Sequence, residues 1–597
     1  MTAARQDADS LPWVVLGAVS IGFHVWLVFS GLIPNLVSRP LHMALALPWI
    51  FLAADRAGGL NGIRSSVSRW LGRLLFALCL PACLWIAWRH DALSDQYGFL
   101  SDSFQTGVAC IVLIGVLEMA RRSIGWPLPL VALLALLYGL FGQYIPGDFG
   151  HPGTPLSSFL GTLTIAEGGL WGSLTGVSVS IVAIFVIFGA VLNAGEAGQG
   201  FMNLATRAAG RLKGGAAKVS VVSSALFGSI SGSASANVAS TGTVTLPAMS
   251  KLGYPKALAG AVEAVASSGG QIMPPLMGAG AFVMVELTGI SYTQIMGAAS
   301  IPALLYFLAV WFGINGFARR FDLKPLAKDQ LPELKLVLVT TGFFLVPFTT
   351  LLLGMFIMGR TPQYAACLAI GAGFVLLLFN AELKPGLRLF VQRLRSLCVQ
   401  SGAQIATIAS IILCASIIVG VLGITGLGVK LTSAILSLSG GHLVPALLLT
   451  ALACLVLGME VPTTAAYVIC VSVAGPALTE LGLPLLTTHL FVFWFALLST
   501  ITPPVCGAVF IAAGMVGENW LKVAAYAMAL GLGLYLIPLT MISHPAILSI
   551  ATTPLAAIVA AILVGSGLAA ISHAITSERG VLFRLGVAAL GCLLLFA

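Results

Sequence analysis

The sequence predicts an all-α polytopic membrane protein, and three observations lead to that prediction. Of the 597 residues, 58% are hydrophobic and only 8% are charged, whereas soluble domains have about 25% charged residues. The mean hydropathy is +1.03. Many apolar runs have the roughly 17–25 residues that a helix needs to cross a bilayer, and none shows the short alternation of barrel strands.

Charge and cysteine usage exclude several classes of function. The net charge of +9 comes from basic residues in short loops between apolar runs, which is typical of membrane topology and predicts no nucleic-acid partner. The ten cysteines lie almost entirely in apolar runs, so we expect reduced, packed thiols and no metal framework. No GxxxxGK[ST], HExxH or GxSxG motif occurs. We therefore expect neither ATP hydrolysis within the chain nor a cofactor, and no enzyme site stands out.

Apolar runs separated by basic loops predict fifteen spans and two further apolar segments. The first ten residues are polar, and no small-residue cleavage signature ends the apolar run that follows, so we expect a cytoplasmic N-terminus without a signal peptide. The predicted spans are 12–33, 41–54, 74–89, 104–120, 125–144, 176–196, 257–285, 293–317, 335–358, 362–380, 398–424, 487–514, 524–546, 551–572 and 581–597.

The two further segments, about 219–249 and 443–478, are predicted to be re-entrant helical hairpins. With the N-terminus inside, all but four of the 29 Lys and Arg residues fall in cytoplasmic loops, as the positive-inside rule requires. This holds only if both segments turn back without crossing. The four exceptions are Arg39, Arg89, Arg360 and Lys430.

Two regions follow from the order of these elements. A boundary near Arg121 and Arg122 divides residues 1–122, a four-span scaffold, from residues 123–597, which contain the hairpins. Within the second region, residues 195–218 are typical of an amphipathic helix along the cytoplasmic interface. Residues 145–175 contain no Lys or Arg, and either an ordinary external loop or a surface helix would fit them.

The hairpins belong to an internal repeat. Gly228 precedes the first proline of a Pro-Pro pair, Pro274, by 46 residues, and Gly458 precedes Pro503 by 45. Each copy contains an apolar helix, a glycine, a polar tip, an apolar return and a span interrupted by Pro-Pro. Five predicted spans separate the hairpins, so they enter from opposite sides and the repeat is inverted.

Paired interrupted segments in an inverted repeat indicate a secondary-transporter site near the bilayer midplane. A broken helix exposes N–H groups at one end and carbonyls at the other, so it can hold an anion and a cation. Proline enforces the break because it cannot donate a backbone hydrogen bond. The carbonyls of Gly270, Gln271, Ser499 and Thr500, upstream of the Pro-Pro pairs, are candidate ligands for a hard cation such as sodium.

The polar hairpin residues admit two interpretations. Small hydroxyl side chains also allow membrane helices to pack closely, but their occurrence in two inverted copies favours a site. Intramembrane carboxylates are functional candidates by default. Glu460 could complete an ion site or face the external mouth, and Glu263 could be functional or simply solvated at a helix end. We expect His24 to be a packed or interfacial residue.

The stretches IVAIFVIFGAVLNAGEAGQGF, SSALFGSISGSASANVASTGTVTLPAM and GGQIMPPL resemble the large membrane subunit of tripartite ATP-independent periplasmic (TRAP) transporters. The resemblance covers about Gly125 to the mid-500s, and the four preceding spans resemble the family's small membrane subunit, fused in front. Such a fusion is similar to the type that works with a TAXI periplasmic binding protein. Spans 551–572 and 581–597 lie beyond this resemblance.

The resemblance implies a sodium-driven, elevator-type importer in a bacterial inner membrane that receives a small organic anion, such as a dicarboxylate, 2-oxoglutarate or glutamate, from the binding protein. A symporter working without a binding protein is the alternative, and an intramembrane enzyme is the alternative from another class. Matching motifs place one sodium site on Ser231, Gly232, Asn237, Gly270 and Pro274, a second on Gly458, Pro462, Thr463, Thr500 and Pro503, and the substrate near Ser233, Ser235 and Thr464.

Overall fold

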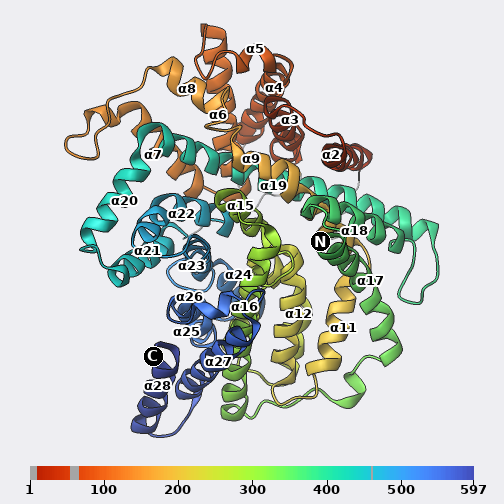
Figure 1. The fold of residues 1–597 in the computed structure, drawn as a ribbon. Helices are drawn as coiled ribbons and strands as arrows, with labels where there is room; N and C mark the ends of the chain where they lie inside the picture. Colours follow the sequence, from red (N-terminus) through yellow and green to blue (C-terminus); the bar gives the residue numbers. More distant parts are fainter. Residues whose placement is uncertain (1–9, 54–65, 459–460, 597) are drawn as a thin grey trace.

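A computed structural model describes residues 10–53, 66–458 and 461–596. In these residues the secondary structure is helical apart from one isolated β-bridge, between Phe379 and Pro385. Eleven of the described helical segments are long and apolar enough to cross a membrane. The chain is therefore an all-α polytopic membrane protein, as its composition predicts (Figure 1).

Of the N-terminal helices, α3 packs against α4 and α4 against α6, whereas α2 packs against a later part of the chain. The fourth predicted span begins where Asp102 caps the N–H of Gln105 at 2.7 Å, and it ends with Arg121 and Arg122, which both pair with Glu118. The elements of this part are α2 Leu11–Phe29, α3 Asn35–Pro48, η1 Trp49–Ala53, α4 Ser66–Trp88, α5 His90–Ser94 and α6 Ser103–Ile124.

The next segment leads from these helices to the first hairpin. Residues 145–175 contain the short helix α8, and the expected amphipathic helix forms as α11, which packs against α12 (Gly215–Ser231) and α17 (Leu334–Leu352). The elements are α7 Pro127–Phe141, η2 Gly142–Tyr144, α8 Leu156–Thr164, α9 Ser173–Val177, η3 Ser178–Val182, α10 Ala183–Ala194 and α11 Ala197–Ala209.

Both predicted hairpins form as pairs of helices, and each is followed by a broken span. In the first repeat these elements are α12 Gly215–Ser231, α13 Ala234–Lys251, α14 Lys256–Gly269, η4 Gly270–Ile272 and α15 Gly278–Thr288. In the second repeat they are α21 Leu443–Leu457, α22 Thr463–Glu480, α23 Leu485–Leu498 and α24 Gly507–Val516. The arms of each hairpin pack against each other and the first arm packs against the following span, α12 on α14 and α21 on α23.

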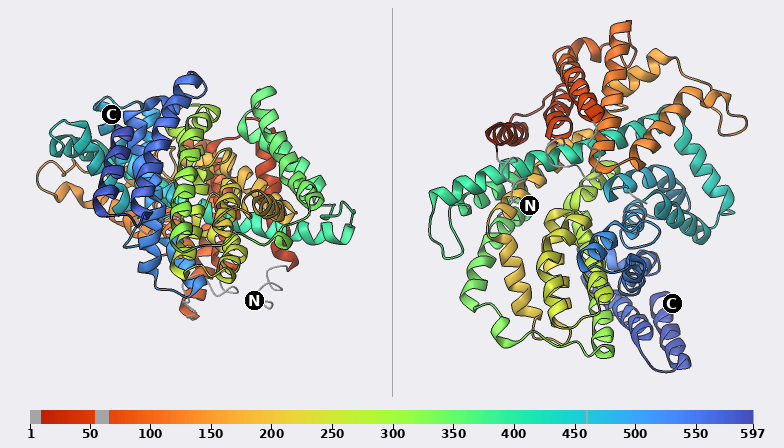
Figure 2. Two further views of the ribbon diagram at one scale, coloured as in Figure 1. Left: turned by 90° about the horizontal axis from the view of Figure 1, so that it is seen from below. Right: turned by 180° about the vertical axis from the view of Figure 1, so that it is seen from behind.

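Between the repeats lie four long elements, of which α19 is the longest. Its 39 residues span about 58 Å at roughly 1.5 Å per residue. The helix begins at Leu387, eleven residues before the predicted span 398–424, and is longer than predicted for that reason. α19 packs against α2, α3, α6 and α7 on one side and against α10 and α22 on the other. Figure 2 shows it running between the N-terminal helices and the repeats. The elements are α16 Tyr292–Arg320, η5 Lys328–Gln330, α17 Leu334–Leu352, η6 Leu353–Ile357, α18 Pro362–Leu376 and α19 Leu387–Thr425.

The remaining helices cover the repeats. α20, which the sequence pattern did not predict, packs against α22. The two C-terminal helices, α27 and α28, pack against each other, and α27 also packs against α16. The predicted span 524–546 is divided at Gly531. These elements are α20 Leu427–Leu438, α25 Trp520–Leu530, α26 Leu532–Ser543, η7 Pro545–Leu548, α27 Pro554–Thr576 and α28 Val581–Phe596.

Candidate functional site

The first broken span opens the helix where the sequence places the Pro-Pro pair. α14 tightens into the turn Gly270–Ile272, the Pro274–Pro275 peptide is cis, and Met277 has a φ of +52° before α15 starts. The carbonyl of Gly270 accepts a hydrogen bond from Met273 N–H at 3.3 Å. Since a carbonyl oxygen has two lone pairs, this candidate ligand keeps one acceptor position.

The first hairpin approaches this break backbone to backbone. An added Cβ on Gly228 would lie 2.3 Å from the Cα of Gly270. At the tip, Gly232 has a φ of +60°, and a Cβ there would lie 2.6 Å from the Cα of Gly278. Glycine is therefore required at both positions for steric reasons, and at the tip also for its left-handed backbone. Hairpin and break form one packed unit.

Asn237 lies at the centre of that unit. Its side chain is completely buried, and its amide Nδ2 donates to the carbonyls of Ser224 at 2.9 Å and Ser267 at 3.4 Å. One asparagine thus joins both hairpin arms to the broken span. Its Oδ1 lies 3.4 Å from Thr241 Oγ1. The structure brings together two residues of the first predicted sodium set, because a Cβ added to Gly270 would lie 2.9 Å from Asn237 Nδ2, whereas Gly232 at the tip contacts Gly278 instead.

The two remaining members of the first set are Ser231 and Pro274. Ser231 ends α12, and its side chain lies outside the described residues. Pro274 belongs to the break itself. Ser233, which is predicted to lie near the substrate, caps α13 by accepting a hydrogen bond from Ala236 N–H at 3.3 Å.

The second repeat has the same plan with looser contacts. Gly458 ends α21, and its added Cβ would lie 3.0 Å from the Cβ of Ser499. Pro462 precedes α22, which begins at Thr463. After α23 the carbonyl of Thr500 accepts Ala508 N–H at 3.3 Å, and the Pro503–Pro504 peptide is cis. Met459 and Glu460, at the tip of this hairpin, lie outside the described residues.

The two repeats contact each other reciprocally. The return arm of the first hairpin, α13, packs against α24 of the second repeat, and the return arm of the second, α22, packs against α15 of the first. Ser235 of α13 lies at the first of these contacts, because a Cβ added to Gly507 of α24 would lie 3.7 Å from its Oγ. Between the breaks, Thr500 Oγ1 lies 2.9 Å from Ser268 Oγ. Each hairpin is thus seated partly on the other repeat.

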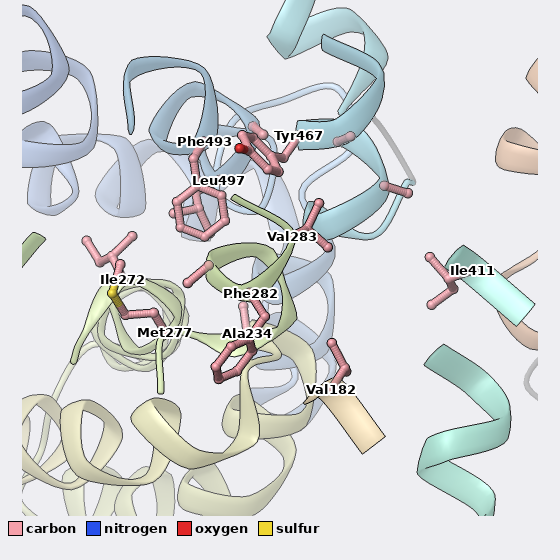
Figure 3. Packing of buried hydrophobic residues seen from close by; sticks show 14 of the residues in the cluster. Val182, Ala234, Ile272, Met277, Phe282, Val283, Ile411, Tyr467, Phe493 and Leu497 are labelled. Carbon is pink, nitrogen blue, oxygen red and sulfur yellow. The ribbon is translucent and has the colours of Figure 1, made fainter. Parts of the chain in front are cut away.

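Apolar side chains fill the rest of this junction. Phe493 of α23 presses on Gly280 of α15, where an added Cβ would lie 2.5 Å from the ring. It also packs edge-on against Tyr467 with ring centroids 5.4 Å apart. Figure 3 shows Phe493 and Tyr467 side by side, with Val283 and Phe282 of α15 nearby.

Thr464 lies where the second hairpin meets α19. It lines a small cavity of about 10 Å³ with residues of α9, α15 and α19: Leu174, Val283, Ile411, Ile412 and Ala415. Space of this size holds about one water molecule. The predicted substrate residues therefore sit on two different hairpins, Ser233 and Ser235 on the first and Thr464 on the second.

Glu263 is buried rather than solvated. Its side chain is fully inaccessible, and its carboxyl group contacts the hydroxyls of Ser220, Thr241, Thr245 and Ser267 from three helices. Sequence reasoning singled out the carboxyl group but not this set of partners. A signal exists in the spacing, because Asn237, Thr241 and Thr245 repeat every four residues and so share one helix face.

Two tyrosines that the sequence did not single out contact the breaks from neighbouring helices outside the repeats. Tyr292 of α16 donates to the Leu276 carbonyl at 2.9 Å and contacts the Pro275 carbonyl. Tyr535 of α26 lies 2.6 Å from Thr502 Oγ1. Elsewhere, His24 is packed: its Nε2 lies 2.8 Å from Nδ1 of the buried His42.

The fold and this site define a multi-pass membrane protein in which two hairpin-and-broken-span repeats are interlocked. Comparison with known families gives the same class. Residues 111–556 match the model of the DctM component of tripartite ATP-independent periplasmic transporters. The chain belongs to this family.

Named relatives are transporter permeases. The isethionate TRAP transporter permease protein DctMQ of Oleidesulfovibrio alaskensis is 25% identical over 85% of this chain and 73% of its own length. The ectoine TRAP transporter large permease protein TeaC of Halomonas elongata is 24% identical over 44% of this chain and 57% of its own. The C4-dicarboxylate TRAP transporter large permease protein DctM of Pseudomonas aeruginosa is 27% identical over 34% of this chain and 47% of its own. The chain thus spans about half the length of the last two.

Proposed function

We propose that this protein is a sodium-coupled secondary importer of a small organic anion in the bacterial inner membrane, with its N-terminus in the cytoplasm. The observation that carries the proposal is the reciprocal seating of two hairpins on two Pro-Pro breaks, with Asn237 buried between the arms of the first. Broken helices of this kind supply backbone groups for ions and anions inside a membrane.

In this proposal a sodium ion would bind at each of the two breaks. Neutral oxygens of Asn237 and Gly270 would ligate sodium in the first repeat, and those of Gly458 and Thr500 in the second, while the substrate would lie between Ser233, Ser235 and Thr464. Sodium is a hard cation and suits such oxygen ligands. The hairpins with their broken spans would move together against α19 and the N-terminal helices, as in an elevator.

Family membership supports the participation of a soluble periplasmic binding protein, here proposed to be of the TAXI type. The relatives named above are permeases for isethionate, ectoine and C4-dicarboxylates, all small polar compounds. We propose a dicarboxylate, 2-oxoglutarate or glutamate as the substrate class of this chain.

The test is uptake of a panel of labelled organic acids into proteoliposomes that contain the full chain. We expect uptake only with an inward sodium gradient and a TAXI-type binding protein. Asn237→Ala and Thr464→Ala should each weaken sodium-dependent uptake, and Lys430→Gln, which changes a half-buried lysine of α20 that contacts the Gly150 carbonyl, should not. Uptake that is undiminished without any binding protein would support the binding-protein-independent symporter instead, and wild-type uptake by both variants would remove the assigned site.

A further inference from the structure

The site proposed above makes no use of the most deeply buried carboxyl group of the first repeat. Glu263 lies on α14, two turns after the helix begins, and its side chain has no exposed surface. Ser220 of α12 donates to its Oε2 at 2.8 Å, and Thr241 and Thr245 of α13 contact Oε1 and Oε2. Three helices therefore converge on one acidic group inside a membrane protein.

An ionised carboxylate in this place would have no cation beside it in the described part of the chain. The basic side chains on the helices that pack against α14 lie elsewhere. Lys218 is stacked on Trp311 at 4.8 Å, and Lys522 pairs with Glu518 at 3.5 Å. The remaining ones are exposed at helix ends: Lys251, Lys256, Arg319 and Arg320.

The neighbouring tyrosines are also engaged with other groups. Tyr306 donates to the Val265 carbonyl at 2.8 Å, Tyr292 donates to the Leu276 carbonyl, and Tyr526 packs edge-on against Phe317. α24 carries no ionisable side chain. Because a buried charge without a counter-charge is costly, Glu263 needs a cation of its own. The hydroxyls touch the carboxyl oxygens directly, so a proton is the cation that fits between them.

The cluster can also satisfy the carboxylate once that proton has left. Four hydroxyls from Ser220, Thr241, Thr245 and Ser267 lie within 3.5 Å of its two oxygens, and an ionised carboxylate accepts about four hydrogen bonds. When the proton is present, Thr241 and Thr245 have other acceptors, the carbonyls of Asn237 at 2.8 Å and Thr241 at 3.0 Å. Both protonation states are thus hydrogen-bonded without moving a helix.

Thr241 connects this acid to the cation ligands proposed above. Its hydroxyl has one proton and lies within reach of Glu263 Oε1, the Asn237 carbonyl and, at 3.4 Å, Asn237 Oδ1. When Glu263 is ionised, that proton points to the carboxylate, and the oxygens of Asn237 are free to bind a cation. When Glu263 is protonated, the hydroxyl can turn to Asn237 and donate to one of those oxygens, which then competes with a cation for it.

We propose that Glu263 is a proton-binding site of the first repeat whose proton exchanges with the cation bound at Asn237. Releasing the proton breaks the O–H bond of the carboxyl group, leaves the electron pair on the carboxylate and transfers the proton to water. Sodium binding then favours release, and by thermodynamic linkage protonation weakens sodium binding to the same extent. The exchange with sodium rests on the proposed function, whereas the proton site itself does not.

The first experiment detects the acid without using sodium. The purified full chain is titrated in a potassium buffer while the infrared C=O band of a buried carboxylic acid is recorded. We expect a band in the wild-type protein that disappears at high pH and is absent in Glu263→Gln. Glu286→Gln, which removes an exposed carboxylate of α15, is the matched control and should keep the band. A wild-type protein whose spectrum equals that of Glu263→Gln at every pH overturns the proton site.

The second experiment measures exchange by adding sodium chloride to the same proteins in weak buffer with a pH-sensitive dye. We expect proton release from the wild type and Glu286→Gln, none from Glu263→Gln, and none from Thr241→Val, which keeps the acid but lacks the linking hydroxyl. The apparent sodium affinity of the wild type should rise up to about tenfold per pH unit across the titration.

The outcomes separate the two proposals. Sodium binding to the wild type that is independent of pH and releases no proton overturns the exchange, while the sodium sites stand. If radioactive sodium does not bind to the wild type at any pH, the sodium-coupled function fails, and the infrared titration still decides on the proton site. If Glu263→Gln is not monodisperse in detergent, Thr241→Val and the wild type alone decide, because a Thr241→Val protein that releases protons like the wild type overturns the linkage.

Discussion

The two repeats share a backbone plan but differ in what fills them. In both, a glycine near the hairpin tip meets a broken span, and a cis Pro-Pro peptide follows. Counting from the paired glycines and prolines, polar side chains of the first repeat correspond to less polar ones of the second: Ser224 to Cys454, Asn237 to Tyr467, Thr241 to Val471 and Glu263 to Val492.

One matched pair shows the consequence. Ser220 donates to Glu263, whereas the hydroxyl at the corresponding position, Thr450, is buried without a hydrogen-bond partner among the described residues. The hydroxyl of Ser220 thus has the carboxyl group of Glu263 as its acceptor, and the second repeat has no carboxyl group at the matched position, Val492. The comparison teaches that the two repeats share the backbone breaks, whereas among the described residues only the first repeat has a buried carboxyl group beside its hairpin.

The largest effect is expected where backbones touch. Gly228→Ala would place a Cβ 2.3 Å from the Cα of Gly270 on another helix, which no side-chain motion relieves, whereas a Cβ on Gly458 would meet the Cys454 carbonyl of its own hairpin arm at 2.7 Å and, on the broken span, only the movable side chain of Ser499 at 3.0 Å. Overpacking costs about 1–3 kcal/mol or more, so we expect about 3 kcal/mol for the first variant and about 1 kcal/mol for the second. Thermal unfolding in detergent measures both. Equal losses would show that the two hairpins are seated equally tightly.

The next effect distinguishes the matched positions Asn237 and Tyr467. Asn237→Ala removes a buried amide that joins three backbone segments, and the loss of such a group costs about 1–3 kcal/mol. We expect sodium binding to weaken about tenfold or more. Tyr467→Phe removes only a hydrogen bond to His489 at 2.7 Å and should leave sodium binding unchanged. Radioactive sodium binding to both variants tests this, and an equal loss would make the second repeat as important as the first.

A smaller effect is expected at the hydrogen bond between the repeats. Ser268→Ala and Thr500→Val each remove the 2.9 Å contact between the breaks, and each should cost about 0.5–1.5 kcal/mol. In a double-mutant cycle the two losses should not add, because they break the same interaction. Additive losses in the unfolding free energy would contradict a direct link between the breaks.

The smallest effect is expected in the apolar interior of the second hairpin. Cys454 and Cys470 lie on opposite arms and contact each other. Cys454→Ser should cost less than about 1 kcal/mol, since a serine hydroxyl can bond to the preceding turn of its own helix. Sodium binding should not change. A loss as large as that of Asn237→Ala would show that the second hairpin also depends on polar contacts between its arms.

Although it predicted fifteen spans where eleven of the described helical segments are long and apolar enough to cross a membrane, the sequence by itself determined the fold class, the positions of most helices and the two helical hairpins. It could do so because hydrophobic run length and Pro-Pro breaks are local properties of the chain. It also singled out Glu263 as a carboxyl group in an apolar run. Among the helices, it missed α20, which is short, the division of the span 524–546 at Gly531, and the early start of α19 at Leu387, where a basic segment continues the helix.

Only the tertiary structure decided which groups meet. The bonds of Asn237 to Ser224 and Ser267, the contact of Ser268 with Thr500 and the hydroxyls around Glu263 join residues up to 232 positions apart. No spacing rule in the sequence specifies such pairs, because they depend on how the helices cross and on which repeat each hairpin is seated. For that reason the sequence left open whether Glu263 was solvated, and the packing of three helices around it answered the question.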